Sequence, residues 1–442
     1  MKIFFAILVG VFAIVLTIAV YRDIQADKHN PADLRNRVVG ARLIKDGRSP
    51  YFYKWKASDG TRYYDPVAFD SLTFSNMTAT PFFHHLMSPL ADLPQRQISR
   101  YWLLIQYIMF LTAVILFFRA APDSERQCLV VVAAALFLLT DGWQMSIQNG
   151  QNYLCIPFFA MLFYFTLSQE KNMLWALAAG TFAMSLILIR PNSVFFFIPF
   201  FLLIKQYTRN YLLALFTPML LVFGWLTFSK QERSLWNDYH RQVIAQIKMH
   251  QGEPAVLQQN EMGPRYTYWE GIDVAELKKE IRNNPIKQHT ENGNFFVLYN
   301  KIFKTKLSLT AITFLSAITL LSLTGYFYYK HWGICPALAR IAIMGFCLYM
   351  VSDLYSPVYR HQYYTVQWMF PLLLTASFFR PSFKWTYVLI WTGLLLNCLD
   401  ISFIKMEHTI GEYLLLVAFI ALSLGRPQSI DHKKDIIGPA GA

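Results

Sequence analysis

Long apolar runs recur along almost the whole chain, and they limit its possible folds more than any other feature. A helix needs roughly 18 or more apolar residues to cross a bilayer, and the chain has about twelve candidate runs, some of them short. Only 15% of the 442 residues are charged, whereas a soluble domain has roughly 25%. The sequence therefore predicts one all-α, polytopic membrane domain over residues 1–442. The candidate runs are 3–20, 101–118, 128–140, 153–167, 174–189, 194–204, 211–228, 307–328, 341–354, 366–379, 387–399 and 413–424.

The positions of lysine and arginine predict the orientation of these spans. Short cytosolic loops are enriched in Lys and Arg, and with Lys2 inside, every predicted inside turn carries a positive charge. Two long polar loops, 21–100 and 229–306, then share the outer face, and residues 425–442 form a cytosolic tail. The first run is longer than the roughly 7–15-residue core of a signal peptide and has no A-x-A site after it. We expect it to be an uncleaved first span.

Composition also excludes several classes of protein. The five cysteines have no paired spacing, so neither a disulfide framework nor a metal site is expected. The net charge of +13 has two interpretations, attraction of anionic headgroups beside a positive-inside bias or recognition of a phosphate-bearing lipid. No nucleic-acid motif, Walker-type phosphate loop, zinc spacing or internal repeat is present.

The first outer loop opens with a predicted helix. Asn30-Pro31 is typical of a helix start, with Asn as N-cap and Pro at the first helical position. Asp33 then occupies the third position, where a carboxylate favours the positive helix end. Apolar residues share one face, which predicts an amphipathic helix lying on the membrane, and Gly47 ends it. Asp33 can be a capping carboxylate only, with the nearby Arg35, Arg37, Arg42 and Lys45 as a solvated face.

Further short helices are expected in both outer loops. Pro81 and Pro89 bracket about two helical turns that contain His84 and His85. In the second loop, residues 272–281 have the pattern of a short helix. Aromatic residues are scattered through the same loop, where they can stack on sugar rings or anchor the loop at the interface. They include Trp236, Tyr239, Tyr266, Tyr268 and Trp269.

Three shorter outer turns carry a high density of polar side chains. The first, 141–152, ends in Gln148, Asn149, Gln151 and Asn152, which can bind sugar hydroxyls or form a capped turn. The second is Arg190-Pro191-Asn192, and the third is 356–364, with Arg360 and His361. Ionisable residues at membrane depth are costly and tend to be functional. All these turns are expected on the same face as Asp33.

These segments, taken in order, resemble a known family of enzymes. Asp33 is followed by Gly40-Ala41-Arg42-Leu43, Gly47 and Pro50-Tyr51, and then by Thr80-Pro81, Ser88-Pro89-Leu90 and Leu93-Pro94. Asn149-Gly150-Gln151-Asn152, Arg190-Pro191 and Ser356-Pro357 with His361 come later. This ordered set, covering most of residues 1–380, resembles glycosyltransferase family 87, the polyprenyl-phosphomannose-dependent α-mannosyltransferases of the GT-C superfamily. The polar stretch between Tyr51 and Pro81, the run 82–85 and the loop 229–306 depart from the family pattern.

The resemblance implies a fold and a set of roles. The fold would be a GT-C-like bundle of about twelve transmembrane helices, with short amphipathic helices in the outer loops. Asp33 would correspond to the catalytic carboxylate, acting as general base, and His361 to a histidine near the active site. Arg360, Arg190 and Arg37 would hold the donor phosphate. Candidates for sugar or acceptor binding are Gln148, Asn149, Gln151, Asn152, Tyr51, His84 and His85.

The resulting hypothesis is an inverting membrane glycosyltransferase with no metal and no cofactor. It would move a sugar, mannose by resemblance, from a polyprenyl-phosphate-linked donor to a lipid or glycan acceptor, among membrane lipids and without nucleic acid. The expected location is the bacterial inner (plasma) membrane, with the site facing the periplasm or exterior. Two alternatives stay open. One is a lipid-linked-sugar flippase or other transporter, and the other is a different GT-C branch with another sugar or acceptor.

Overall fold

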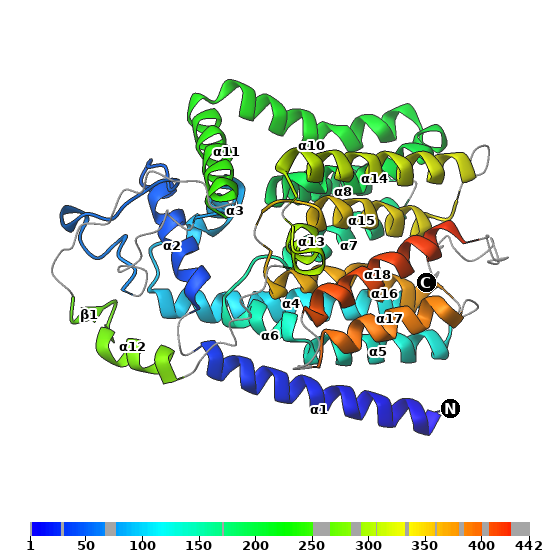
Figure 1. The fold of residues 1–442 in the computed structure, drawn as a ribbon, viewed down its shortest axis with the longest axis horizontal. Helices are drawn as coiled ribbons and strands as arrows, with labels where there is room; N and C mark the ends of the chain where they lie inside the picture. Colours follow the sequence, from blue (N-terminus) through cyan, green and yellow to red (C-terminus); the bar gives the residue numbers. More distant parts are fainter. Residues whose placement is uncertain are drawn as a thin grey trace.

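The chain is almost entirely helical in the computed structural model (Figure 1). The structure describes residues 2–27, 31–66, 77–169, 172–250, 266–283, 293–305, 307–331, 336–358, 360–379, 384–399 and 406–425. Most of the long helices run side by side as a bundle, with α1 along one edge and α10 and α14 at the opposite edge (Figure 1).

Five helices in the described part are long and apolar enough to cross a membrane. A sixth span results if α5 (Ser124–Leu139) and α6 (Asp141–Gln148), which meet at an angle of 56°, are counted together. The five long helices and α5 each coincide with a run predicted from the sequence, whereas α6 lies in residues 141–152, which were expected to form an outer turn. The five are α1 (Lys2–Asp27), α4 (Gln95–Ala120), α10 (Arg209–Phe228), α14 (Leu309–Lys330) and α18 (Glu407–Leu424).

The remaining predicted runs form shorter helices, so the expectation of about twelve spans is not confirmed. A straight span needs roughly 20 residues to cross 30 Å of hydrocarbon. Prolines contribute to the interruptions: Pro191 and Pro199 lie at the starts of 3-10 helices rather than inside a long α-helix. The shorter elements are α7 (Cys155–Leu167), α8 (Met173–Ile189), α9 (Val194–Phe197), α15 (Leu338–Leu354), α16 (Met369–Phe378), α17 (Lys384–Leu396) and the 3-10 helices Pro191–Ser193, Ile198–Gln206 and Gln362–Trp368.

The parts of the outer loops that the structure describes gather mainly at one end of the bundle. In Figure 1, α2, α3, α11, α12 and β1 lie at that end, whereas the start of α1 and the end of α18 lie at the other. The orientation of this end in the membrane stays a prediction. The elements of the two outer loops are α2 (Ala32–Lys45), α3 (Pro81–Met87), α11 (Lys230–His250), α12 (Val274–Asn283), α13 (Phe295–Phe303), β1 (Tyr268–Trp269), β2 (Ile272–Asp273) and the 3-10 helices Ala57–Asp59 and Ser88–Leu90.

A small hairpin joins the second outer loop to the first. Strands β1 and β2 pair through a turn at Glu270 and Gly271, both with positive φ. One carboxylate oxygen of Glu270 accepts a hydrogen bond from Arg42, and the other accepts one from the backbone N–H of Gln95, which starts α4. Beside this hairpin, Trp269 packs in an aromatic cluster with Trp55 and Tyr64 of the first loop. The predicted helix 272–281 is confirmed as α12, starting two residues later.

Helix α2 is confirmed as a helix, but its surroundings differ from those expected. It begins at Ala32, so Pro31 precedes the helix and Asp33 is its second residue; Asn30 lies outside the described residues. The arginines expected on a solvated face are buried. Arg35 contacts Asp65, and Arg42 donates to the carbonyls of Ala91 and Leu93. Helix α2 is therefore packed among residues of the two outer loops rather than laid on a membrane surface.

Glycines bring some bundle helices into direct backbone contact. A Cβ placed on Gly180 in α8 would lie 2.0 Å from the carbonyl oxygen of Leu215 in α10. A Cβ on Gly224, also in α10, would meet nothing within 4 Å. Only the first position therefore needs glycine for packing.

We predict that Gly180→Ala destabilises the bundle, whereas Gly224→Ala does not. Overpacking typically costs about 1–3 kcal/mol, and alanine is otherwise the better helix former by about 1 kcal/mol. Thermal unfolding of the two purified variants in the same detergent tests this. Equal midpoints would show that α8 and α10 separate at no cost.

Candidate functional site

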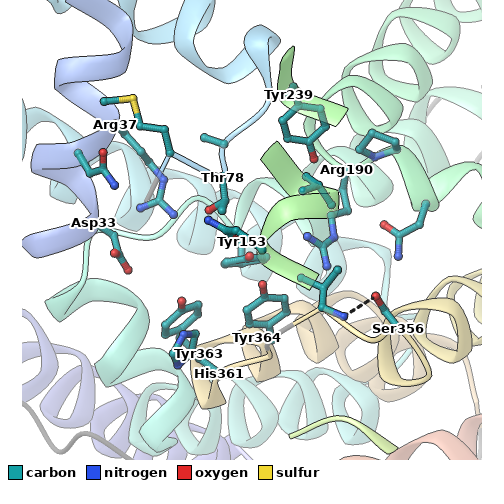
Figure 2. Close-up of a pocket in the computed structure, with 18 of the residues that line it drawn as sticks. Asp33, Arg37, Thr78, Tyr153, Arg190, Tyr239, Ser356, His361, Tyr363 and Tyr364 are labelled. Atoms are coloured by element: carbon teal, nitrogen blue, oxygen red, sulfur yellow. Dashed lines mark hydrogen bonds between the residues drawn. The ribbon is translucent and has the colours of Figure 1, made fainter. Parts of the chain in front are cut away.

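A cavity of about 560 Å³ opens between the end of the bundle and the outer loops. It contains four of the residues that the sequence singled out: Asp33, Arg37, Arg190 and His361. Figure 2 shows Asp33 and Arg37 on one side of the cavity, Arg190 on the other, and tyrosines between them. The remaining lining residues are Asn36, Met77, Thr78, Ala79, Tyr153, Pro191, Asn192, Tyr239, His240, Val243, Gln246, Ser352, Ser356, Val358, Tyr363 and Tyr364.

Gln151 connects the two charged groups of α2 that line the cavity. Its side-chain amide donates to the Asp33 carboxylate, and its amide oxygen accepts from Arg37. Arg37 also donates to the carbonyl of Gly150 over 3.0 Å. Asp33 still lies in the first turn of α2, where the helix dipole favours its charge. Its hydrogen bond to Gln151, however, comes from a residue 118 positions away. Asp33 is therefore more than a local capping group.

The turn 149–152 delivers Gln151 by ending α6 with a Schellman motif. Gly150 has φ +62°, its N–H donates to Ile147, and the N–H of Gln151 donates to Ser146. A Cβ on Gly150 would lie 2.5 Å from the Cβ of Leu34 in α2. Glycine is required here by both backbone conformation and contact. The turn is thus capped, as one interpretation of the sequence held, and it also carries Gln151 to Asp33.

The protein around Asp33 changes its acidity. Burial raises the pKa of Asp33 above its ordinary value of 3.8, while Arg37, Arg35 and the hydrogen bond from Gln151 oppose that rise. A carboxylate with a raised pKa accepts a proton more readily than an ordinary one. A titratable group with a shifted pKa inside a cavity is a candidate for acid–base chemistry.

Arg190 occupies the opposite side because of the proline after it. Pro191 disfavours the α conformation at the preceding residue, and Arg190 has φ −142° and ψ 94° at the end of α8. Its guanidinium carbon lies 5.7 Å from the ring centre of Tyr153 and 5.4 Å from that of Tyr364, and it forms an ion pair with Asp353. Arginine presents a planar set of donors that suits phosphate.

Aromatic rings connect the two sides of the cavity. His361 stacks on Tyr363 with 4.9 Å between ring centres, and Tyr363 stacks on Tyr364 at 5.4 Å. Tyr364 in turn lies 4.0 Å from Tyr153. The segment 356–358, which precedes these stacked rings in the chain, is held by Asn294, which donates to the carbonyls of Ser356 and Val358. An aromatic surface of this kind can support a sugar ring by contact with its apolar face.

Several residues predicted for the site lie away from the cavity wall. Arg360 is buried between Asp353 and Glu412. Asn149 donates to the carbonyl of Met145 in its own helix, and Tyr51 donates to that of Ala79. Gln148, Asn152, His84 and His85 are likewise absent from the lining, and Gln151 acts through its bonds to Asp33 and Arg37.

The two adjacent histidines of α3 have different surroundings. His84 is fully buried against Gly40, and its Nδ1 lies 3.2 Å from the carbonyl oxygen of Arg37. Burial lowers the pKa of His84 to about 3, so this ring is neutral near pH 7 and suits packing rather than anion binding. His85 contacts Glu232 of α11 over 3.0 Å. Together they connect α3 to α2 on one side and to α11 on the other.

Sequence reasoning missed most of the uncharged lining. Tyr153, Tyr363 and Tyr364 lie in or beside apolar runs, where aromatic residues usually pack in the core. Tyr239 was noted as one of several loop aromatics, and the structure places it on the wall opposite Tyr364 (Figure 2). The useful signal was the adjacency of Tyr363 and Tyr364 to His361. Among the described residues, no group of three or more His, Cys, Asp or Glu side chains is arranged to hold a metal ion.

Comparison with known proteins gives one finding. Residues 78–262 match the family model of glycosyltransferase family 87, the family that the sequence motifs resemble. The matched region includes Gln151, Arg190 and Tyr239, and it begins after Asp33 and ends before His361. Comparison with curated proteins and with solved structures gave no match.

We predict that Asp33→Asn does not lower thermal stability. Because the folded-state pKa is raised, ionisation of Asp33 opposes folding. That cost is absent below the ordinary pKa of the unfolded carboxyl group and complete above the raised folded pKa. The unfolding midpoint of the variant relative to the native protein should therefore rise as pH increases through this window. A variant that is less stable at neutral pH would instead assign Asp33 a structural role.

Proposed function

We propose that the protein uses this cavity to transfer a sugar from a polyprenyl-phosphate-linked donor to an acceptor hydroxyl. The proposal starts from the match to glycosyltransferase family 87, which implies a glycosyltransferase. The observation that carries this proposal is the meeting of Asp33, Arg37 and Arg190 in one cavity of about 560 Å³. Ligand pockets commonly enclose roughly 300–1,000 Å³, so a sugar and part of its acceptor fit this space. Mannose is proposed as the sugar because the family resemblance favours it.

Asp33 is the proposed general base. The acceptor oxygen attacks the anomeric carbon and gives its proton to the Asp33 carboxylate. As the new bond forms, the bond between the anomeric carbon and the phosphate oxygen breaks, and its electron pair leaves with the phosphate. One such displacement inverts the anomeric centre. The raised pKa of Asp33 suits this role, because a base works best when its pKa approaches the working pH.

The leaving phosphate needs positive charge where its own charge develops. Arg190 is the proposed main partner, since it lines the cavity at the side opposite Asp33 (Figure 2). Arg37, on the same side as Asp33, and His361, also in the cavity lining, are proposed to contribute further donors. Arg360 is not carried into this role, because its guanidinium is bound to two buried carboxylates. The stacked rings of Tyr153, Tyr364 and Tyr363 are proposed to support the sugar ring.

The location of the cavity supports a lipid-linked donor. It lies where the ends of α8 and α15 meet α2 and α11, next to helices that are apolar enough to cross a membrane. A polar headgroup can enter there while its isoprenoid tail stays among apolar helices. We propose that this end faces the exterior of a bacterial inner membrane, where both long loops meet.

We predict that Asp33→Asn lowers sugar transfer by about 10²–10⁴-fold, the range expected for loss of a general base. Asp59→Asn is the matched control, because Asp59 pairs with Arg48 in the same outer loop and does not line the cavity. The measurement is transfer of labelled mannose from polyprenyl-phosphate mannose by each purified variant in nanodiscs. Near-native transfer by Asp33→Asn would remove Asp33 from the chemistry. Binding of labelled donor without turnover for any acceptor would favour a transporter.

The same proposal predicts an acid limb in the pH profile. Transfer requires ionised Asp33, so kcat/KM should fall as pH decreases through the raised pKa of this carboxyl, above its ordinary value of 3.8. The residual activity of Asp33→Asn should lack this limb. An identical acid limb in both proteins would assign the ionisation to another group.

We predict that His361→Ala lowers transfer by about 10-fold or more, as loss of a bond to a charged group does. His361→Phe retains a ring to stack on Tyr363 but removes both nitrogens, so it should not restore the rate. Recovery in the phenylalanine variant would limit His361 to packing.

A further inference from the structure

Four ionisable side chains, alternately basic and acidic, run from the cavity wall into the protein interior. Arg190 contacts Asp353, Asp353 contacts Arg360, and Arg360 contacts Glu412 on α18. The Arg360 Nε lies 3.0 Å from Asp353, and its Nη2 lies 2.8 Å from Glu412. Only Arg190 retains appreciable exposure, with 20% of its side chain accessible, whereas Asp353 has none.

The contacts fix the plane of the Arg190 guanidinium. Tyr153 and Tyr364 lie within 6 Å of its central carbon, and Asp353 binds one of its terminal nitrogens. The Nε of Arg190 has no hydrogen-bond partner among the described residues. A buried donor left unsatisfied is costly. This nitrogen is itself enclosed, so a ligand oxygen in the cavity meets the accessible part of the Arg190 side chain instead.

Arg360 determines how strongly Asp353 can hold Arg190. With Arg360 present, one oxygen of Asp353 binds Arg190 and the other binds Arg360. Without Arg360, both oxygens would be free to bind Arg190, which would compensate its charge more completely and draw it away from the cavity. Glu412 binds Arg360 from the far side, and Trp368 donates to Glu412 over 3.0 Å. Asp353 therefore divides its charge between two arginines, and Arg360 divides its charge between two carboxylates.

We propose that Asp353, Arg360 and Glu412 are positioning residues that hold Arg190 ready for the phosphate of a lipid-linked donor. This inference rests on the proposed function, and it assigns a role to α15 and α18, which lie outside the matched region 78–262. Arg360, predicted from the sequence to touch the phosphate, acts through Asp353 instead.

The experiment measures binding of farnesyl phosphate and of farnesol to the purified full-length protein by calorimetry. Their difference in affinity isolates the phosphate from the isoprenoid tail. Glu412→Gln removes one carboxylate of this series while retaining volume, and Glu270→Gln is the matched control at a partly buried ion pair, with Arg42, that does not line the cavity. The double variant Arg360→Met/Glu412→Leu removes a whole ion pair, a change that proteins often tolerate.

We expect the double variant to bind farnesyl phosphate about tenfold more weakly, in line with the strength of bonds to charged groups, because both oxygens of Asp353 can then bind Arg190. Glu412→Gln should bind farnesyl phosphate more tightly, because Arg360 without Glu412 holds Asp353 more strongly and leaves the charge of Arg190 less compensated. Farnesol binding should not change, and Glu270→Gln should bind both compounds as the native protein does. Equal loss for both compounds, or native affinity in folded variants, would overturn the positioning role. If the double variant does not fold, Glu412→Gln alone decides. If the native protein prefers farnesyl phosphate no more than farnesol, the proposed donor class itself fails, and the positioning role fails with it.

Discussion

The bridge that Gln151 makes between Asp33 and Arg37 is the contact on which the site depends. It joins the first outer loop to the turn after α6, beside the hydrogen bond from Arg37 to the carbonyl of Gly150. Gly150 allows the approach, because any side chain there would collide with Leu34. The bridge also keeps the Asp33 carboxylate and the Arg37 guanidinium side by side, each bound to the same side-chain amide. Asp33 can therefore stay available to a substrate while Arg37 moderates the cost of its charge.

The sequence predicted the location of helices better than it predicted the number of spans. Apolar composition identifies a helix within a membrane protein, and each predicted run does coincide with a helical segment. Whether a run crosses the membrane depends on where it is broken, however, and the breaks at Thr140 and Tyr355 involve distant elements. The N–H of Asp141 donates to the carbonyl of Asn397, and Tyr355 stacks on Phe295. The 3-10 helix before α16 is one such case. Its residues pack against α6, which lies more than 200 positions earlier in the chain.

The site was predictable where a motif has a local physical cause. Arg190-Pro191 turns an arginine out of a helix, and Asn149–Asn152 ends one helix with a glycine, so both positions could be found from neighbouring residues. Arg360 could not be assigned correctly, because its partner Glu412 lies 52 positions away on another helix. The tyrosines were missed for a related reason. In a membrane protein an aromatic ring beside an apolar run is ordinary, and only the fold shows that three of them form one surface.

The connection between α10 and α11 has a mechanical consequence. Helix α10 packs against α8 along one face, where the carbonyl of Leu215 approaches Gly180. Few of its other residues are buried, so its remaining surface faces lipid and its tilt follows the thickness of the bilayer. Ser229 alone separates α10 from α11, which carries Tyr239 and Val243 into the cavity wall. Within α11, Asp238 accepts a hydrogen bond from Ser49 of the first outer loop. A change in the tilt of α10 therefore bears on α11 through Ser229 and on α8 through their direct contact, and both helices lead to the cavity.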